Sequence, residues 1–230
     1  MKAKHVIPVH ETSMEAVEKR IRAEADHADV LEIWLDSIQD LRLAELFFVK
    51  EEVDVPFLFV NKAPVEGGDF MGSEEDRVEL LLECLARGAE YVDLGMQTSS
   101  NLIKEVIKKN EESKVILSHH DFEKTPSFEE LKAIALQAHK KGADIVKIAT
   151  FAKTIGDNVT LFDLLKWSEE KKISLVAIAM GEAGQISRVM GPLLGSAFYY
   201  APLDEGVGTA PGQLTKKQLE AIWGHLISNA

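Results

Sequence analysis

One lysine, Lys147, lies within an otherwise apolar run of the chain, Asp144-Ile-Val-Lys-Ile-Ala149. Side chains alternate between the two faces of a strand, so Ile145, Lys147 and Ala149 share one face. Burial disfavours the ammonium form and is expected to lower the pKa of this lysine, and the neutral amine is the form that adds to a carbonyl. The run therefore suggests a Schiff base with a keto substrate. The alternative is a lysine paired with a buried carboxylate, or one that extends to solvent.

Two consecutive histidines, His119 and His120, close the preceding apolar run Val115–Leu117. Adjacent side chains of a strand point to opposite faces, so one of the two faces the same side as the lysine. Histidine titrates near neutral pH and suits proton transfer. A metal site that includes Asp121, or a polar loop, is the competing interpretation, although consecutive histidines chelate one ion poorly. Neighbouring strand ends converge, so the histidine and the lysine are expected to lie close together.

Three other segments contain polar residues that could bind a substrate, but their sequence patterns are less specific. Arg188 follows a glycine-containing turn and could bind a carboxylate through two hydrogen bonds. The segment Thr209–Gln213 provides hydroxyl and amide donors on a loop stiffened by proline. Glu66-Gly67-Gly68 is most simply a turn, and Cys84, beside leucines, is interpreted as a core residue.

Short β-branched runs alternate with longer amphipathic segments along the whole chain. The expected strands are His5–Val9, Val30–Asp36, Pro56–Val60, Tyr91–Met96, Lys114–His119, Asp144–Phe151, Ser174–Met180 and Ser196–Pro202. The expected helices include Ser13–Ala25, Ser73–Arg87, Ser127–Lys141 and Leu214–Ile227. The first two begin with a serine cap, and the third ends at Gly142, where a glycine commonly follows a helix.

Strands alternating with helices in this way predict a (β/α)8 TIM barrel of the α/β class, with residues 1–230 forming a single domain. A doubly wound sheet is disfavoured because the first turn, Pro8–Thr12, lacks a glycine-rich sequence. In such a barrel the chemistry lies at the C-terminal ends of the strands.

Composition excludes several classes of partner. The net charge of −12 argues against binding to nucleic acid or to an anionic membrane surface. No apolar run approaches the ~20 residues of a membrane span, and the N-terminus lacks the long apolar region of a signal peptide. A single cysteine fits a reducing cytoplasm. A cytoplasmic protein that acts on a small molecule is expected.

Taken in order, several segments resemble type I 3-dehydroquinate dehydratase, the Schiff-base enzyme of the shikimate pathway and of aromatic amino acid biosynthesis. The most specific are the Ser-x-His-Asp-Phe sequence, with its Thr-Pro, and the downstream lysine. The matching segments are Leu31–Asp36, Glu66–Gly68, Ser118–Phe122 with Thr125-Pro126, Ala143–Ala149, Met180–Glu182 with Ser187-Arg188, Gly195-Ser196 and Ala210–Gln213.

The resemblance implies a role for each matched residue. Lys147 would be the Schiff-base lysine and His120, not His119, the general acid and base. Arg188 and Gln213 would bind the substrate carboxylate, with Thr209 where a serine is common, and Glu32 would bind a hydroxyl. Lys62, aligned with a family arginine, is the remaining substrate-binding candidate. The resemblance also implies a homodimer and a lyase that needs no metal and no redox cofactor.

Three positions depart from the family pattern. Trp34 and Lys62 each stand where the family has an arginine, and Gly95 replaces a glutamate close to the catalytic histidine. Exchange of arginine for lysine changes the hydrogen-bonding geometry, and exchange for tryptophan removes a charge.

Three functions follow. The first is dehydration of 3-dehydroquinate to 3-dehydroshikimate. The second is a diverged Schiff-base lyase, or an aldolase-like enzyme, that acts on another polyhydroxy ketone, which the changes at Trp34 and Gly95 motivate. The third is a non-catalytic descendant that binds a metabolite. Retention of His120 and Lys147 argues against the third.

Overall fold

Eight strands and eight helices alternate along the chain in the computed structural model, which describes residues 3–110, 112–204 and 210–227. The strands are β1 Lys4–Val9, β2 Val30–Trp34, β3 Phe57–Val60, β4 Tyr91–Gly95, β5 Lys114–Asp121, β6 Ile145–Phe151, β7 Leu175–Met180 and β8 Phe198–Tyr200. The helices are α1 Met14–Glu24, α2 Leu43–Glu51, α3 Glu74–Ala86, α4 Ser100–Lys109, α5 Phe128–Lys140, α6 Asp157–Lys171, α7 Gln185–Met190 and α8 Lys216–Ile227.

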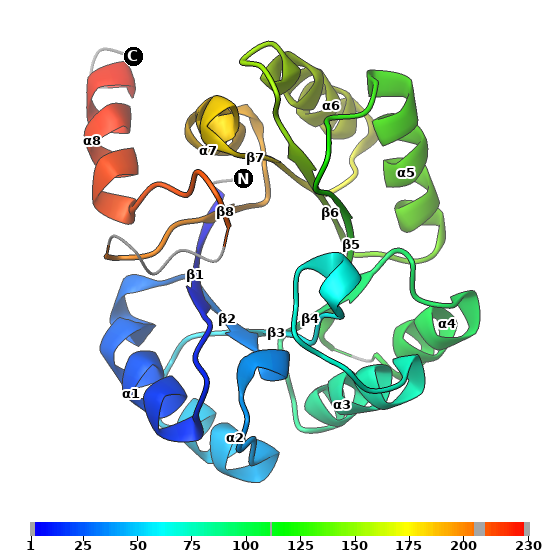
Figure 1. Cartoon of the computed structure of the whole chain (residues 1–230), viewed down its shortest axis with the longest axis vertical. Helices are drawn as coiled ribbons and strands as arrows, with labels where there is room; N and C mark the ends of the chain where they lie inside the picture. The colour runs from blue at the N-terminus through cyan, green and yellow to red at the C-terminus, as the bar shows by residue number, and fades with distance from the viewer. Residues whose placement is uncertain (1–2, 111, 205–209, 228–230) are drawn as a thin grey trace.

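The strands form one parallel sheet with the order β7-β6-β5-β4-β3-β2-β1-β8, which is the order of a (β/α)8 barrel. The helices surround this sheet, and the strands gather at the centre (Figure 1). At the junction of β7 and β8, the Ala197 N–H donates to the Leu175 carbonyl at 2.8 Å. The predicted fold class is therefore confirmed.

All eight predicted strands are present, with shifts at their ends. The second ends at Trp34 because residues Leu35–Ser37 form a 3-10 turn, in which the Ser37 hydroxyl donates to the Trp34 carbonyl at 2.9 Å. The fifth continues to Asp121 and so includes both histidines. The strand that carries His120 is thus longer than the sequence indicated.

Serine caps start α1 and α3 as predicted, and a third serine caps α5. Ser13 accepts a hydrogen bond from Ala16 at the start of α1, and Ser73 and Ser127 form capping boxes at the starts of α3 and α5. Gly142, beyond the end of α5, has φ +101°, the conformation expected of a glycine after a helix C-terminus. These caps fix where each helix begins and ends around the barrel.

The barrel interior changes from apolar to polar along the strands. Its apolar layer includes Tyr91, Ile116 and Ile145, which are all buried. The next inward-facing positions, two residues further along β4, β5 and β6, are Asp93, Ser118 and Lys147, and the next are Gly95, His120 and Ala149. The sequence alternation therefore places the lysine and the histidine on the inside, near the C-terminal ends of their strands.

The described part of the chain contains no helix that is long and apolar enough to cross a membrane.

Candidate active site

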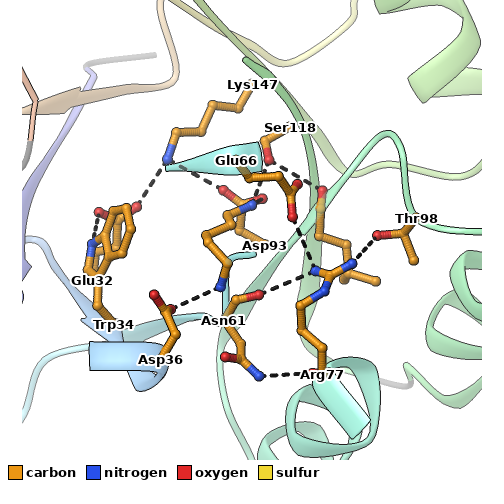
Figure 2. A network of polar contacts seen from close by, with 12 residues as sticks. Glu32, Trp34, Asp36, Asn61, Glu66, Arg77, Asp93, Thr98, Ser118 and Lys147 are labelled. Atoms are coloured by element: carbon orange, nitrogen blue, oxygen red, sulfur yellow. Dashed lines mark hydrogen bonds and ion pairs between the residues drawn. The ribbon is translucent and has the colours of Figure 1, made fainter. Parts of the chain in front are cut away.

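Lys147 lies in the middle of β6 with its side chain inside the barrel and only 7% of its surface exposed. Its ammonium nitrogen Nζ donates to Glu32 Oε1 at 3.0 Å and to Asp93 Oδ2 at 3.4 Å (Figure 2). Nζ also lies 4.4 Å from the centre of the Tyr200 ring. The β2, β4 and β8 strands thus all contribute a partner to this one group.

The charge state of Lys147 differs from the prediction. Burial alone would lower the pKa, as the sequence argument assumed, but the neighbouring Glu32 and Asp93 carboxylates outweigh it and raise the pKa well above the ordinary value. The predicted lowering is wrong because the amino-acid sequence does not reveal which carboxylates face the lysine. The resting side chain is therefore an ammonium, and it must lose a proton before it can add to a carbonyl.

Asp93 joins Lys147 to a second buried lysine. Asp93 is fully buried, and its Oδ1 accepts a hydrogen bond from Lys62 Nζ at 2.7 Å. Lys62 Nζ also donates to the Ser118 hydroxyl at 2.8 Å. Burial would raise the pKa of Asp93, but the ammonium groups of Lys62 and Lys147 lower it to about 2. Asp93 is therefore a carboxylate anion shared between two ammonium groups.

Glu32 is held from the other side by Trp34. The indole N–H of Trp34 donates to Glu32 Oε2 at 3.0 Å, while Oε1 accepts from Lys147. The Trp34 ring packs edge-on against His10, with ring centres 5.2 Å apart. Trp34, at the position where the resemblance implies an arginine, thus supplies a neutral hydrogen-bond donor to the carboxylate next to the lysine.

His120 lies two residues beyond Ser118 on β5, and its ring stacks on Phe122 with centres 5.8 Å apart. Its Nδ1 is buried and has no hydrogen-bond partner among the described residues. Burial, together with the positive charges of Lys62 and Lys147, lowers the pKa of His120 to about 3. The imidazole is therefore neutral at physiological pH, the form in which it can accept a proton.

A pocket with about 540 Å³ of empty space opens at the C-terminal ends of the strands. The residues that line it come from six of the strands or the segments after them, and include five of the predicted site residues. They are Glu32, Trp34, Glu66, Gly67, His120, Phe122, Lys147, Ala149, Ile178, Met180, Arg188, Tyr200, Ala210 and Gln213.

Arg188 and Gln213 reach the pocket from α7 and from the segment before α8. Arg188 is 5% exposed, and its Nη2 donates to the Pro211 carbonyl at 3.3 Å, whereas its Nε is buried without a partner in the described structure. Burial lowers the pKa of Arg188 to about 10, so the guanidinium stays charged at neutral pH. A buried, charged guanidinium with an unused donor is suited to binding an anion.

Lys62 is the one predicted site residue, among those that the structure describes, that is not in the pocket lining. It lies in the network of Asp93 and Ser118 and is 2% exposed. Its direct role in substrate binding stays a prediction. Thr209 lies outside the described residues. The described part of the chain has no group of three or more histidine, cysteine or carboxylate side chains that could hold a metal ion.

Glu66 lines the pocket, although the sequence argument assigned it no role in the site. A Cβ atom added to Gly95 would lie 1.5 Å from Glu66 Oε1, so the Glu66 carboxylate fills the space into which a side chain at position 95 would extend. Tyr200 and Asp93 were also missed as partners of Lys147. Counting every second residue back from the strand ends would have identified these two as inward-facing. Glu66 belongs to the Glu-Gly-Gly segment, which the sequence argument interpreted as a turn.

Comparisons with known proteins match nearly the whole chain. The family described as Type I 3-dehydroquinase matches residues 5–228. A 3-dehydroquinate dehydratase of Methanothermobacter thermautotrophicus is 36% identical over 228 residues, which cover 99% of each chain. One from Desulfotalea psychrophila is 37% identical over 198 residues, 85% of this chain and 86% of that protein.

Solved structures give the same result. The type I 3-dehydroquinate dehydratase of Clostridium difficile has a TM-score of 0.89 and 26% identity, and the match covers 100% of this chain and 94% of that one. A 3-hexulose-6-phosphate synthase, at 16% identity and a TM-score of 0.63, shares the barrel fold.

Proposed function

The chain belongs to the type I 3-dehydroquinase family, and we propose that it dehydrates 3-dehydroquinate to 3-dehydroshikimate through a Schiff base at Lys147. The observation that carries the proposal is the placement of Lys147 and His120 in one pocket, on adjacent strands, together with a buried arginine that also lines it. A keto acid of this kind needs an amine, a proton acceptor and an anion-binding group, and the pocket provides all three.

The reaction starts with loss of a proton from the Lys147 ammonium. Glu32, which already accepts a hydrogen bond from this group at 3.0 Å, is positioned to take the proton. The neutral amine adds to the ring ketone to give a carbinolamine, which loses water to form an iminium. The iminium withdraws electrons and acidifies the adjacent C–H bond. Neutral His120 takes that proton, and the electron pair of the C–H bond forms the enamine.

The enamine then expels the β-hydroxyl, which leaves as water after His120 returns its proton to that oxygen. Formation of the new C=C bond regenerates an iminium, now conjugated. Water adds to this iminium and releases 3-dehydroshikimate and the free Lys147 amine. The atoms balance with one molecule of water lost from the substrate, and no step requires an oxidant or a reductant.

The remaining pocket residues orient the substrate in this proposal. Arg188 and Gln213 bind the substrate carboxylate, and Thr209 provides a hydroxyl donor next to them. Glu32 accepts a hydrogen bond from a substrate hydroxyl. The contacts of Lys62 support a role in holding Asp93, while its direct contact with substrate stays a prediction.

A second candidate is the same Schiff-base chemistry on another polyhydroxy ketone. Trp34 favours it, because this residue replaces a cation in the pocket wall with a neutral aromatic ring. The two candidates separate when purified protein is given 3-dehydroquinate and, in parallel, other polyhydroxy ketones. Appearance of the ultraviolet absorbance of a conjugated enone from 3-dehydroquinate supports the first. Poor turnover of 3-dehydroquinate beside good turnover of another ketone would replace it with the second.

We infer further that residues 1–230 act as one catalytic domain, and that the protein is a cytoplasmic homodimer. The continuous sheet from β7 to β8 supports the single domain, and the one cysteine, buried in α3, fits a reducing compartment. The dimer rests on the family resemblance. Light scattering of the purified protein tests it, with the mass of two chains expected and the mass of one chain as the contrary result.

A further inference from the structure

Tyr200 is a buried phenol in the pocket that the proposed reaction does not yet use. It is the last residue of β8, it is only 5% exposed, and it lines the same pocket as Lys147. Its hydroxyl is buried and has no hydrogen-bond partner among the described residues. Buried polar groups are ordinarily paired, because an unpaired one has lost its hydrogen bonds to water without replacement. An unpaired hydroxyl in a pocket wall therefore points to a partner that arrives with the substrate.

The phenol ring lies beside the amine that attacks the ketone. Lys147 Nζ is 4.4 Å from the centre of the Tyr200 ring, within the range of a cation–π contact. When Nζ bonds to the carbonyl carbon, the carbonyl oxygen is only two bonds away from Nζ. That oxygen therefore gains its negative charge close to the ring that carries the hydroxyl.

The surroundings keep the phenol protonated. Burial raises the pKa of Tyr200 above its ordinary value, and the Glu32 and Asp93 carboxylates add to this effect, while the Lys147 ammonium opposes it. The phenol is therefore neutral at physiological pH and has a proton to donate. Glu32 and Asp93, in contrast, both accept hydrogen bonds from Lys147 in the resting site.

The other donors that line the described part of the pocket have partners or tasks elsewhere. The indole N–H of Trp34 donates to a carboxylate. In the proposed reaction Arg188 and Gln213 bind the substrate carboxylate, and His120 exchanges protons with the C–H bond and with the leaving hydroxyl. The phenol is the donor that remains for the ketone oxygen.

We propose that the Tyr200 hydroxyl donates a hydrogen bond to the substrate ketone oxygen and protonates this oxygen when Lys147 adds to the carbonyl. The proposal rests on the function assigned above. As the bond from Nζ to the carbonyl carbon forms, the C=O double bond becomes a C–O single bond, and its oxygen takes the phenol proton. The nitrogen of the adduct then returns a proton to the Tyr200 oxygen. The proton that Glu32 took from Lys147 leaves with the substrate oxygen as water when the iminium forms.

In the competing interpretation Tyr200 only packs its ring against the ammonium group. A cation–π contact requires the ring and not the hydroxyl, so phenylalanine would serve equally well. An unpaired buried hydroxyl also lowers stability. Tyr200→Phe separates the two interpretations because it keeps the ring and removes only the hydroxyl.

The test measures how fast the adduct on Lys147 forms. Protein in excess over 3-dehydroquinate is mixed, stopped at set times with borohydride, and weighed by intact mass spectrometry. We expect Tyr200→Phe to form the adduct about tenfold to a hundredfold more slowly, at the lower end of the 10²- to 10⁴-fold effect of a positioned proton donor. The control is Tyr199→Phe, whose ring packs against Trp223 with centres 5.1 Å apart and which should match the wild type. An unchanged rate in Tyr200→Phe, or an equal fall in the control, would overturn the proposal.

The same change in a His120→Ala background tests whether the phenol acts directly on adduct formation. In that background the reaction stops after the iminium, so the adduct accumulates. We expect Tyr200→Phe to slow adduct formation there by a similar factor, because the two side chains act on different steps. Absence of any further slowing would show that Tyr200 acts only through His120, and would overturn the proposal.

The outcome is distinguishable from a failure of the assigned function. Wild-type protein that neither forms an adduct nor produces the conjugated enone would reject the function itself. Wild-type turnover with an unchanged adduct rate in Tyr200→Phe would reject only the role of Tyr200. Urea unfolding, followed by circular dichroism, is measured for each variant, and the midpoint of Tyr200→Phe should equal or exceed that of the wild type. Failure of this variant to fold would also overturn the proposal, because it would show that the hydroxyl is needed for structure.

Discussion

Asp93 is a single buried anion between two ammonium groups, so removal of its charge should destabilise the protein strongly. Asp93→Asn keeps the size of the side chain and leaves an oxygen that can accept from Lys62. It also leaves two buried lysines with Glu32 as the one carboxylate bonded to either of them in the described structure. The variant therefore tests whether the negative charge of Asp93, and not only its hydrogen bonds, is needed to stabilise the two buried lysines.

The magnitude follows from the distances. At 2.7 Å and 3.4 Å, the attractions of Asp93 to Lys62 and Lys147 are about 6 and about 5 kcal/mol at an effective dielectric constant of about 20. Desolvation of the carboxylate offsets much of this. Removal of one partner from a buried pair costs about 3 to 5 kcal/mol, because the remaining charge is unpaired. We expect that loss in the free energy of unfolding for Asp93→Asn.

The assay is urea unfolding at pH 7, with the midpoint and slope fitted for each variant. The control is Glu83→Gln, which breaks an exposed ion pair with Arg87 of similar length, 2.8 Å, and should cost less than about 1 kcal/mol. Lys62→Met combined with Asp93→Asn removes a cation with the anion and should recover at least half of the loss. A cost for Asp93→Asn as small as that of the control would refute the reasoning.

Two further predictions concern the hydrogen bond of Trp34 and the charge of His120. Trp34→Phe keeps an aromatic ring but loses the N–H that donates to Glu32 at 3.0 Å. A hydrogen bond to a charged group contributes about 1.5 kcal/mol, so its loss should lower kcat/KM about tenfold. Steady-state kinetics measure this ratio, and an unchanged kcat/KM would contradict the prediction. The pKa of His120 is lowered from 6.5 to about 3 in the folded state. Below pH 6.5 the unfolded chain therefore binds a proton at this residue that the folded protein does not. The free energy of unfolding should fall by about 1.4 kcal/mol per pH unit as the pH drops below 6.5. His120→Asn should have a shallower pH dependence in urea unfolding between pH 7 and pH 4, and an identical dependence would contradict the lowered pKa.

The barrel could be predicted from sequence because its signals are local. Serine caps at Ser13 and Ser73 and the glycine after α5 mark helix boundaries through contacts within a few residues. Strand alternation placed Lys147 on the inner face for the same reason. Each of these features depends on neighbours in the chain, and each is present in the structure.

The electrostatics of the site could not be predicted in the same way. The partners of Lys147 are 115 and 54 residues away in the chain, so burial was visible in the sequence and the compensating carboxylates were not. The pKa of Lys147 is consequently raised and not lowered. Gly95 appeared as the loss of an acidic group, whereas in three dimensions it makes room for Glu66.

The central claim is that Lys147 is the nucleophile. The most direct test is to mix the protein with 3-dehydroquinate, reduce it with borohydride, and measure the intact mass and the modified peptide. We expect one adduct per chain, mapped to Lys147, no adduct in Lys147→Ala, and trapping without rapid dehydration in His120→Ala. An unchanged mass in the wild type while the substrate is turned over, or an adduct on another lysine, would contradict the account.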